Sequence, residues 1–369
     1  MSWVLTEQDL HDLSIGAGVL GTGGGGNPYL GYLHVRELLR AGTRITVVPA
    51  STLEDTDLIC PVGGIGAPTI SIERLPNGGE YLGAMRAVEM AWGRPVTHVS
   101  SIEIGGANAL RPLVVAAQAG LPLVDGDGMG RAFPELQMCT FAIADLPITP
   151  IALQDVRGNA LLIRKVASAR WAEQIARAAT VAMGGSAAMA LFCLPAADYR
   201  RAAIPGTVSL AARVGRAVRL ARERHRDPVD AMLALLPGQQ LCTGKVVDVE
   251  RRTTQGFARG RVVLSSGSRR IGIDFQNEYL IAQDLETGDA LVTVPDLICL
   301  VHPETGEPLT TEVLRYGYQV TVLAIAAPGP LKSPEALSMV GPQAFGYSDP
   351  YRPLPGNLCT AAGAQEHTA

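Results

Sequence analysis

The stretch Leu121-Pro-Leu-Val-Asp-Gly-Asp-Gly-Met-Gly-Arg131 joins the end of a predicted strand to a polar, glycine-rich turn. Its apolar residues, 121–124, indicate a buried strand that ends at Asp125. Two carboxylates, three glycines and an arginine then fall within seven residues, 125–131. Such a composition suits a site where backbone and charge face a ligand at the carboxyl end of a strand. The alternative interpretation is an Asp-Gly-rich turn that caps the next helix.

Strand and helix patterns alternate through the first part of the chain. Thr6 and Asp9 form a predicted capping box at the first helix. Strands are predicted at 44–49, 57–62, 98–103 and before Asp125, and helices at 81–92, 107–119 and over most of 167–236, where residues 188–194 form one more strand. Strands separated by helices are typical of a parallel sheet covered on both faces. We predict an α/β domain over residues 1–236, a three-layer α/β sandwich with a mostly parallel sheet.

The pattern changes at about Gly238 to short segments of alternating polarity. Seven such segments lie between residues 243 and 324, separated by turns at hairpin spacing. We predict a small all-β barrel domain at 237–330. Residues 331–369 are expected to form a C-terminal extension that packs on the surface, with about the last ten residues disordered.

The composition limits the classes of protein to which the chain can belong. It has 369 residues, a formal net charge of -4, and 18% charged residues. This favours a soluble, cytoplasmic protein, because neither a signal peptide nor a membrane-spanning apolar run is recognisable. The arginines of 211–226 alternate with apolar residues, as on a solvated helix face, so nucleic acid is not an expected partner. The six cysteines form no C-x-x-C pair and are expected to be buried free thiols.

Glycine clusters follow three predicted strands, at 63–68, 103–108 and 125–131. The carboxyl ends of parallel strands meet at one edge of a sheet, so these clusters predict a shared ligand cleft. A fourth cluster, 21–26, follows a helix and lacks a G-K-[ST] motif; it is either an anion-binding nest or a flexible connector. The predicted ligand-binding residues are Gly24, Gly25, Gly64, Gly66, Gly105, Gly106, Asn108, Gly128 and Arg131.

Acidic residues accompany the glycine clusters. Glu103, Asp125 and Asp127 are the catalytic candidates, because carboxylates at strand ends can share a proton or act as a base. Asp125, Asp127 and Glu135 are the candidate ligands of a divalent metal. The six histidines form no H-x-x-x-H pair, so a zinc site built from histidine and cysteine is not apparent from spacing. The absence of G-x-S-x-G gives no support to a serine hydrolase.

Several motifs resemble those of the S-methyl thiohydantoin desulfurase family. They are LGTGGGG (20–26), GAPTISIERL (66–75), EIGGANALRPL (103–113), VDGDGMGRAFPELQM (124–138), NEYL (277–280), PDLICL (295–300) and GPQAFGYSDPY (341–351). They cover almost the whole chain in order. Two residues depart from the family pattern: Arg74 stands where lysine is common, and His302 stands where an acid is common.

The resemblance implies a three-layer α/β domain followed by a small β-barrel. It also implies removal of sulfur from a thiohydantoin or S-methyl thiohydantoin, as in the breakdown of ergothioneine-type compounds, with a divalent metal, expected to be zinc. Metal-bound water would attack the sulfur-bearing ring carbon, and Asp127 or Glu103 would take its proton. Glycine amides and Arg131 would hold the ring oxygen and any carboxylate.

A second class of function stays open. The chain could be a non-catalytic or accessory ligand-binding subunit of a hydantoinase- or oxoprolinase-type enzyme that acts on cyclic ureides or lactams. The glycine cluster 21–26 favours that interpretation, and the clustered acids favour catalysis. In either case the expected partner is a small cyclic ureide, with neither nucleic acid nor membrane, and a homo-oligomer stays open.

Overall fold

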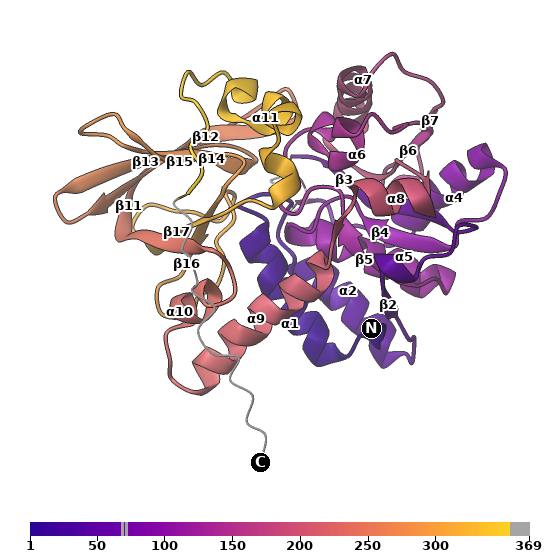
Figure 1. The fold of residues 1–369 in the computed structure, drawn as a ribbon, viewed down its shortest axis with the longest axis horizontal. Helices are drawn as coiled ribbons and strands as arrows, with labels where there is room; N and C mark the ends of the chain where they lie inside the picture. Colours follow the sequence, from indigo (N-terminus) through magenta and orange to yellow (C-terminus); the bar gives the residue numbers. More distant parts are fainter. Residues whose placement is uncertain (68–69, 71–72, 355–369) are drawn as a thin grey trace, which may run out of the picture.

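Two β-sheets, one in each half of the chain, organise the fold (Figure 1). The computed structural model describes residues 1–67, 70 and 73–354. The large sheet has the strand order β1-β2-β5-β4-β3-β8-β6-β7, with β9 paired to β3 and β10 to β5. Its strands are β1 (Trp3–Val4), β2 (Thr46–Pro49), β3 (Leu58–Gly66), β4 (His98–Ser101), β5 (Leu123–Asp127), β6 (Ile151–Gln154), β7 (Ala160–Ile163), β8 (Ser186–Ala190), β9 (Leu194–Pro195) and β10 (Ile204–Pro205).

The large sheet is mixed, so the prediction of a mostly parallel sheet is wrong. Strands β2, β5, β4 and β3 are parallel neighbours, as the strand-helix alternation predicts. Beyond β3, however, β8 pairs antiparallel with Val62–Gly66, and β6 and β7 add an antiparallel hairpin. The sequence pattern does not predict that hairpin, because its two strands have four residues each. The fold is therefore a mixed α/β fold.

Alternate residues of β3 enter different apolar clusters. Leu58, Cys60 and Val62 pack with residues of the helices at 80–92 and 111–119. Ile59 and Ile65 belong to the larger cluster, which includes side chains from the helices between residues 169 and 223. This alternation is expected of a strand that is buried on both faces. A regular three-layer sandwich stays a prediction.

The helices predicted after Thr6, at 81–92 and within 167–236 are present, the one at 107–119 begins as a 3-10 turn, and the helix at 29–40 was not predicted. The main helices are α1 (Glu7–Leu20), α2 (Tyr29–Arg40), α4 (Glu80–Trp92), α5 (Arg111–Ala119), α6 (Thr140–Ile143), α7 (Ala169–Ala182), α8 (Ala196–Ala202), α9 (Thr207–Glu223), α10 (Pro228–Leu233) and α11 (Pro334–Val340). The short 3-10 helices are η1 (Ala50–Thr52), η2 (Gly106–Ala109), η3 (Leu136–Met138), η4 (Gly329–Lys332) and η5 (Pro342–Phe345). The predicted capping box of α1 is present, because Thr6 and Asp9 accept each other's backbone N–H groups. Among the helices described, none has the length and apolarity needed to cross a membrane.

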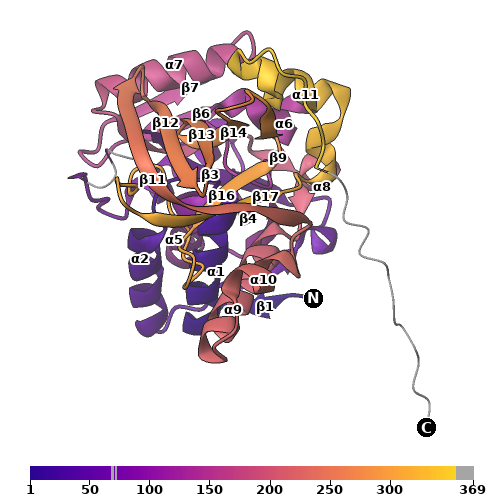
Figure 2. The ribbon, with the colours of Figure 1, turned by 90° about the vertical axis from the view of Figure 1, so that its left-hand side faces the viewer.

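The second sheet is antiparallel throughout and curls into a half-barrel (Figure 2). Its order is β15-β14-β13-β12-β11-β17-β16. The strands are β11 (Gly238–Thr254), β12 (Phe257–Ser266), β13 (Arg269–Gln276), β14 (Glu278–Asp284), β15 (Ala290–Thr293), β16 (Leu297–Val301) and β17 (Gln319–Ile325). Two register shifts in β11, at Gln240/Cys242 and Val246/Asp248, break the pairing of this long strand, and such bulges increase local bending and twist. The predicted all-β character is thus confirmed, whereas the domain limits stay predictions.

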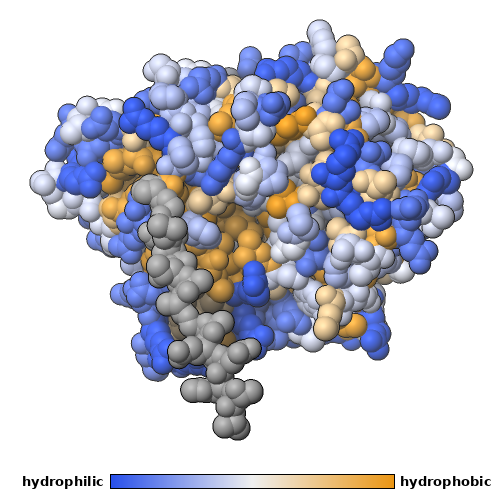
Figure 3. Space-filling model, viewed as in Figure 1, coloured by the Kyte–Doolittle hydropathy of each residue, from blue (hydrophilic) through white to orange (hydrophobic). Residues whose placement is uncertain are grey.

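The C-terminal segment folds back onto the second sheet. The buried carboxylate of Asp296 accepts hydrogen bonds from the Ala327 N–H at 2.7 Å, the Tyr351 hydroxyl at 3.0 Å and the Leu354 N–H at 3.2 Å. Residues 355–369, which include the predicted disordered end, lie outside the described residues. On the face shown in Figure 3, apolar surface gathers where the two halves of the molecule meet, and hydrophilic residues cover much of the periphery.

Candidate active site

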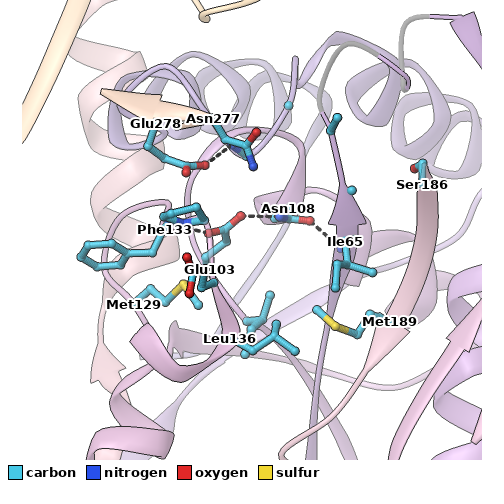
Figure 4. A pocket seen from close by; sticks show the side chains of 18 of the residues that line it. Ile65, Glu103, Asn108, Met129, Phe133, Leu136, Ser186, Met189, Asn277 and Glu278 are labelled. Carbon is cyan, nitrogen blue, oxygen red and sulfur yellow. Dashed lines mark hydrogen bonds between the residues drawn. The ribbon is translucent and has the colours of Figure 1, made fainter. Parts of the chain in front are cut away.

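A pocket lies between the ends of the large-sheet strands and the turn that joins β13 to β14 (Figure 4). Its position agrees with the rule that ligands bind beyond the carboxyl ends of parallel strands. The lining residues used below are Gly25, Gly26, Gly64, Gly66, Glu103, Asn108, Arg111, Met129, Phe133, Glu135, Arg177, Ser186, Asn277 and Glu278. We call it the carboxylate pocket, because Glu103 and Glu278 face its interior.

Glu103 reaches the pocket from the loop that follows β4. Its Oε1 accepts a hydrogen bond from the Asn108 side-chain amide, and its Oε2 accepts one from the Phe133 N–H at 3.0 Å. The residue is 4% exposed. Burial raises the pKa of Glu103 to about 7, although both hydrogen bonds act in the opposite direction. Near neutral pH this carboxyl group can therefore either accept or release a proton.

Glu278 enters the same pocket from the start of β14, so both halves of the molecule contribute acids to it. Its Oε1 accepts a hydrogen bond from the Gly25 N–H at 3.2 Å, whereas its Oε2 has no hydrogen-bond partner among the described residues. Burial raises the pKa of Glu278 well above its usual range, and the charge of Glu103 raises it further. Two carboxylates in one buried site cannot both ionise cheaply, so one of them retains a proton.

The hydrogen bonds indicate which of the two carboxyl groups keeps that proton. Glu103 accepts one hydrogen bond on each oxygen, and such bonds favour the ionised form. The Glu278 side chain accepts one hydrogen bond, from a backbone N–H, on one of its two oxygens. Ionisation therefore costs more at Glu278. The arrangement favours an ionised Glu103 beside a protonated Glu278.

Close backbone contacts explain the glycine clusters around these acids. A Cβ atom on Gly24 would overlap the Glu278 carboxyl group, and one on Gly25 would overlap the Gly105 carbonyl. Gly106 has φ 60° and lies against the carbonyls of Gly24 and Gly26. Gly24, Gly105 and Gly106 were predicted to bind ligand, but their positions bring the two loops together and make room for Glu278.

Asn108 connects the first acid to the neighbouring strand end. Its side-chain oxygen accepts a hydrogen bond from the Gly64 N–H at 2.8 Å and one from the Arg111 guanidinium. A Cβ atom on Gly64 would overlap that guanidinium, which also lies 5.5 Å from the centre of the Tyr81 ring. Asn108, Gly64 and Gly66 all line the pocket, and their ligand-binding role stays a prediction.

Two residues with unfavourable backbone angles flank the acids. Thr22 has φ 48° and Asn277 has φ 61°, which is a backbone conformation that residues other than glycine rarely adopt. The Thr22 carbonyl accepts the Tyr279 N–H at 2.8 Å, and the Asn277 side chain accepts the Ala258 N–H at 2.9 Å. Such strain persists where surrounding contacts hold it, and it is frequent at functional sites.

Asp125 does not line the carboxylate pocket. Its oxygens accept hydrogen bonds from the Ser209 N–H at 3.0 Å and the Ser209 hydroxyl at 2.5 Å. Ser209 lies in the first turn of α9, where backbone N–H groups lack partners within the helix. The structure therefore places Asp125 outside the carboxylate pocket, where it caps α9, and its catalytic role stays a prediction.

Asp127 is fully buried behind the pocket wall and does not line the pocket. Its Oδ2 accepts three backbone N–H groups, from Ile104 at 2.9 Å, Met129 at 3.0 Å and Gly130 at 2.7 Å. Burial raises the pKa of Asp127 to about 7. Because Ile104 follows Glu103 directly, Asp127 holds the loop that carries the catalytic candidate. Neighbouring Gly128 leaves space for the Cys139 side chain and does not face the pocket.

Arg131 is fully buried and contacts protein groups. Its guanidinium donates to the Thr22 hydroxyl at 2.8 Å and to the carbonyls of Pro295 and Asp296, both at 3.0 Å. Burial lowers the pKa of Arg131 to about 10. These contacts join the glycine-rich loop to the second sheet, and the role of Arg131 in holding a substrate carboxylate stays a prediction.

The three predicted metal ligands have separate partners. Asp125 caps α9, and Asp127 accepts backbone N–H groups. Glu135 lines the pocket, but its oxygens accept hydrogen bonds from the side chains of Gln137 and Gln276. Within residues 1–67, 70 and 73–354, no three His, Cys, Asp or Glu residues are grouped so that they could hold a metal ion. The described donors therefore do not fit a three-ligand protein site, and the metal stays a prediction.

Several pocket residues were not predicted from the sequence. Glu278 and Asn277 belong to the NEYL motif, which contributes to the family resemblance but suggests no chemistry of its own. Arg111, at the start of α5, lines the pocket without having been predicted. Arg177 comes from α7 and donates to the Pro134 carbonyl at 2.9 Å. The available sequence signal for Glu278 was an Asn-Glu pair at the start of a segment of alternating polarity.

Comparison with known proteins identifies the family. An S-Me-THD-like N-terminal domain model matches residues 8–165, and an S-Me-THD-like C-terminal domain model matches residues 167–354. This division differs from the predicted one at 236/237. A protein from Chromobacterium violaceum with an X-ray crystal structure is 25% identical, with a TM-score of 0.82 over 96% of this chain and 100% of that chain. The comparison with curated proteins found no match. The two domain models cover nearly all of the described chain, which therefore belongs to the S-Me-THD-like family, the S-methyl thiohydantoin desulfurase family that its motifs resemble.

Proposed function

We propose that the chain is an enzyme that hydrolyses the carbon–sulfur bond of a thiohydantoin or S-methyl thiohydantoin. The observation that carries this proposal is the pair of buried carboxyl groups, Glu103 and Glu278, which face one pocket with raised pKa values. Family membership supports a thiohydantoin-related function. The products are a hydantoin and methanethiol from the S-methyl ring, or hydrogen sulfide from the thione.

The chemistry needs one base and one acid. The ring carbon between the two nitrogens is electrophilic and carries the sulfur. As water attacks this carbon in the S-methyl ring, the Glu103 carboxylate takes a proton from it, a carbon–oxygen bond forms, and the π electron pair of the C=N bond moves onto the ring nitrogen. That pair re-forms the C=N bond as the carbon–sulfur bond breaks with both electrons leaving on sulfur, and protonated Glu278 supplies a proton to the departing thiolate. The hydroxyl proton then moves to the ring nitrogen to give the hydantoin, and the proton on Glu103 passes back to Glu278. No electron transfer to an external partner is required.

Arg111 is the proposed donor to the ring oxygen. The glycine amides are less suitable than predicted, because the Gly25 N–H is bonded to Glu278 and the Gly64 N–H to Asn108. Arg111 lines the pocket and donates to Asn108 through one of its nitrogen atoms. A guanidinium carries five N–H donors, so others stay free for a ligand.

Zinc stays part of the proposal as a cofactor, although no step above passes through it. A divalent metal would make bound water more acidic and polarise the ring. Because the described donors do not form a three-ligand set, metal content has to be measured on the purified protein. Loss of thiol release on chelation, with recovery on adding zinc, would support the metal.

The test is thiol release from S-methyl thiohydantoins by the wild-type chain and by Glu103→Gln. The amide keeps the shape of the side chain but cannot accept the water proton. We expect kcat to fall by roughly 10²–10⁴-fold, the usual contribution of a positioned base. Thiol release by the variant at the wild-type rate would contradict the role of Glu103. Ligand binding without thiol release by the wild type would instead favour the accessory subunit.

A further inference from the structure

A second cavity opens beside the carboxylate pocket, between α2, α4, α5 and β8. The two share three lining residues, Gly26, Arg111 and Ser186. The remaining wall used here consists of Tyr29, Leu30, His34, Arg74, Leu75, Glu80, Tyr81, Val114, Val156, Ala187 and Ala188. Arg111 stands at the boundary, so a ligand held by this side chain can extend into both spaces.

The sizes of the two spaces differ. The carboxylate pocket has a volume of about 60 Å³, and the second cavity has about 300 Å³. An ordered water needs roughly 10–15 Å³ of such space. The carboxylate pocket therefore has room for about as many heavy atoms as a five-membered ring contains. A substituent on that ring needs additional room, and the second cavity supplies it directly beside the acids.

The walls of the second cavity favour an apolar or aromatic group. Leucine, valine, alanine and tyrosine side chains supply most of its apolar surface. Two of the charged groups have protein partners: Arg74 donates to a backbone carbonyl at 3.0 Å, and Glu80 accepts a backbone N–H at 2.8 Å. Asn27, His34 and Gln154 also line the cavity. A mainly apolar wall with a few polar groups is typical of a small-molecule site.

We propose that the second cavity binds the substituent at the saturated ring carbon of the substrate, and that this substituent is apolar or aromatic, of leucine to phenylalanine size. This inference rests on the proposed function, because it assumes that the ring lies between Glu103 and Glu278. Arg111 then contacts the ring oxygen at the boundary, and Leu30 and Tyr81 contact the substituent. The substrate class is a thiohydantoin derived from an apolar amino acid.

The experiment measures binding, so that it does not depend on turnover. Calorimetry gives the Kd of hydantoin, 5-benzylhydantoin and 5-(2-carboxyethyl)hydantoin for the wild type and for Leu30→Trp, which fills the cavity. Glu37→Trp is the matched control, because it adds the same side chain to an exposed position of the same helix. Leu30→Ala enlarges the cavity and serves as the second variant if Leu30→Trp does not fold.

We expect the benzyl compound to bind the wild type and Glu37→Trp at least about tenfold more tightly than hydantoin, as burial of several apolar groups predicts. Leu30→Trp should make the Kd values of the two compounds equal, and Leu30→Ala should change their ratio. Equal Kd values for the two rings, or tighter binding of the carboxyethyl compound, would overturn the inference.

Thiol release distinguishes the two failures. Release without any substituent preference overturns the cavity assignment alone. A substituent preference in binding without thiol release overturns the proposed reaction alone.

Discussion

The acids at the end of β5 and the acids around the carboxylate pocket belong to similar sequence settings but have different surroundings. Asp125 accepts hydrogen bonds from Ser209 on both oxygens, whereas Asp127 accepts three backbone N–H groups on Oδ2 and has no partner for Oδ1 among the described residues. Neither aspartate lines the pocket. Glu278 also has an oxygen without a described partner, but it shares the pocket with Glu103. A buried carboxylate outside a pocket stabilises the loops around it, whereas a buried pair that faces a pocket can exchange a proton with a ligand.

The largest expected difference between these regions is catalytic. Glu278→Gln removes the proposed proton donor, and we expect kcat for S-methyl thiohydantoin to fall by roughly 10²–10⁴-fold. Asp125→Asn should leave kcat near the wild-type value, because this residue lies outside the pocket and caps α9. Steady-state thiol release measures both variants at one pH.

The two variants also serve as controls for each other in folding. Asp125→Asn should lower the free energy of unfolding by about 0.5–2 kcal/mol, the usual cost of a lost helix cap. If Asp125→Asn reduced kcat as strongly as Glu278→Gln, the assignment of the reactive pair would be wrong.

The next effect concerns Arg131, which joins the glycine-rich loop to the second sheet. Arg131→Met removes donors from the Thr22 hydroxyl and from the carbonyls of Pro295 and Asp296. Buried acceptors left without donors are costly, so we expect the free energy of unfolding to fall by about 3 kcal/mol. Urea denaturation measures this loss. A ligand-binding role would instead predict a raised KM with stability within about 0.5 kcal/mol of wild type.

The sequence predicts local features of the fold better than long-range ones. The capping box of α1 depends on Thr6 and Asp9, three residues apart, and it is present. The parallel strands follow from the strand-helix alternation. The antiparallel pairing of β8 with β3 is set by tertiary packing, so a pattern confined to each segment could not predict the mixed sheet.

The same limit applies to the site. Glycine clusters at strand ends placed Gly64, Glu103 and Asn108 in one pocket. The hydrogen bond between Glu278 and Gly25 spans 253 residues, and Asp125 meets Ser209 84 residues away. Residue type indicates which side chains can do chemistry, but long-range contacts decide which carboxyl groups face the pocket and can reach a ligand.

The last effect is a pH dependence of stability that separates Asp127 from an ordinary exposed acid. Its pKa is about 7 in the folded chain, against about 4 for the usual aspartate, so the folded chain binds more protons than the unfolded chain between these values. The stabilisation is present below about pH 4 and is lost as pH rises through about 7. In that window Asp127 lowers the free energy of unfolding by at most about 1.4 kcal/mol per pH unit.

Asp127→Asn should remove this contribution, because the amide does not titrate. Urea denaturation at pH 5, 6, 7 and 8 should therefore give a flatter dependence for the variant than for the wild type. Glu103 retains its own raised pKa of about 7, so part of the wild-type slope should persist in Asp127→Asn. Parallel curves would mean that Asp127 is ionised throughout, with its three N–H donors outweighing burial. The contrast between the two acid regions would then rest on position alone, since Glu103 and Glu278 line the pocket and Asp127 does not.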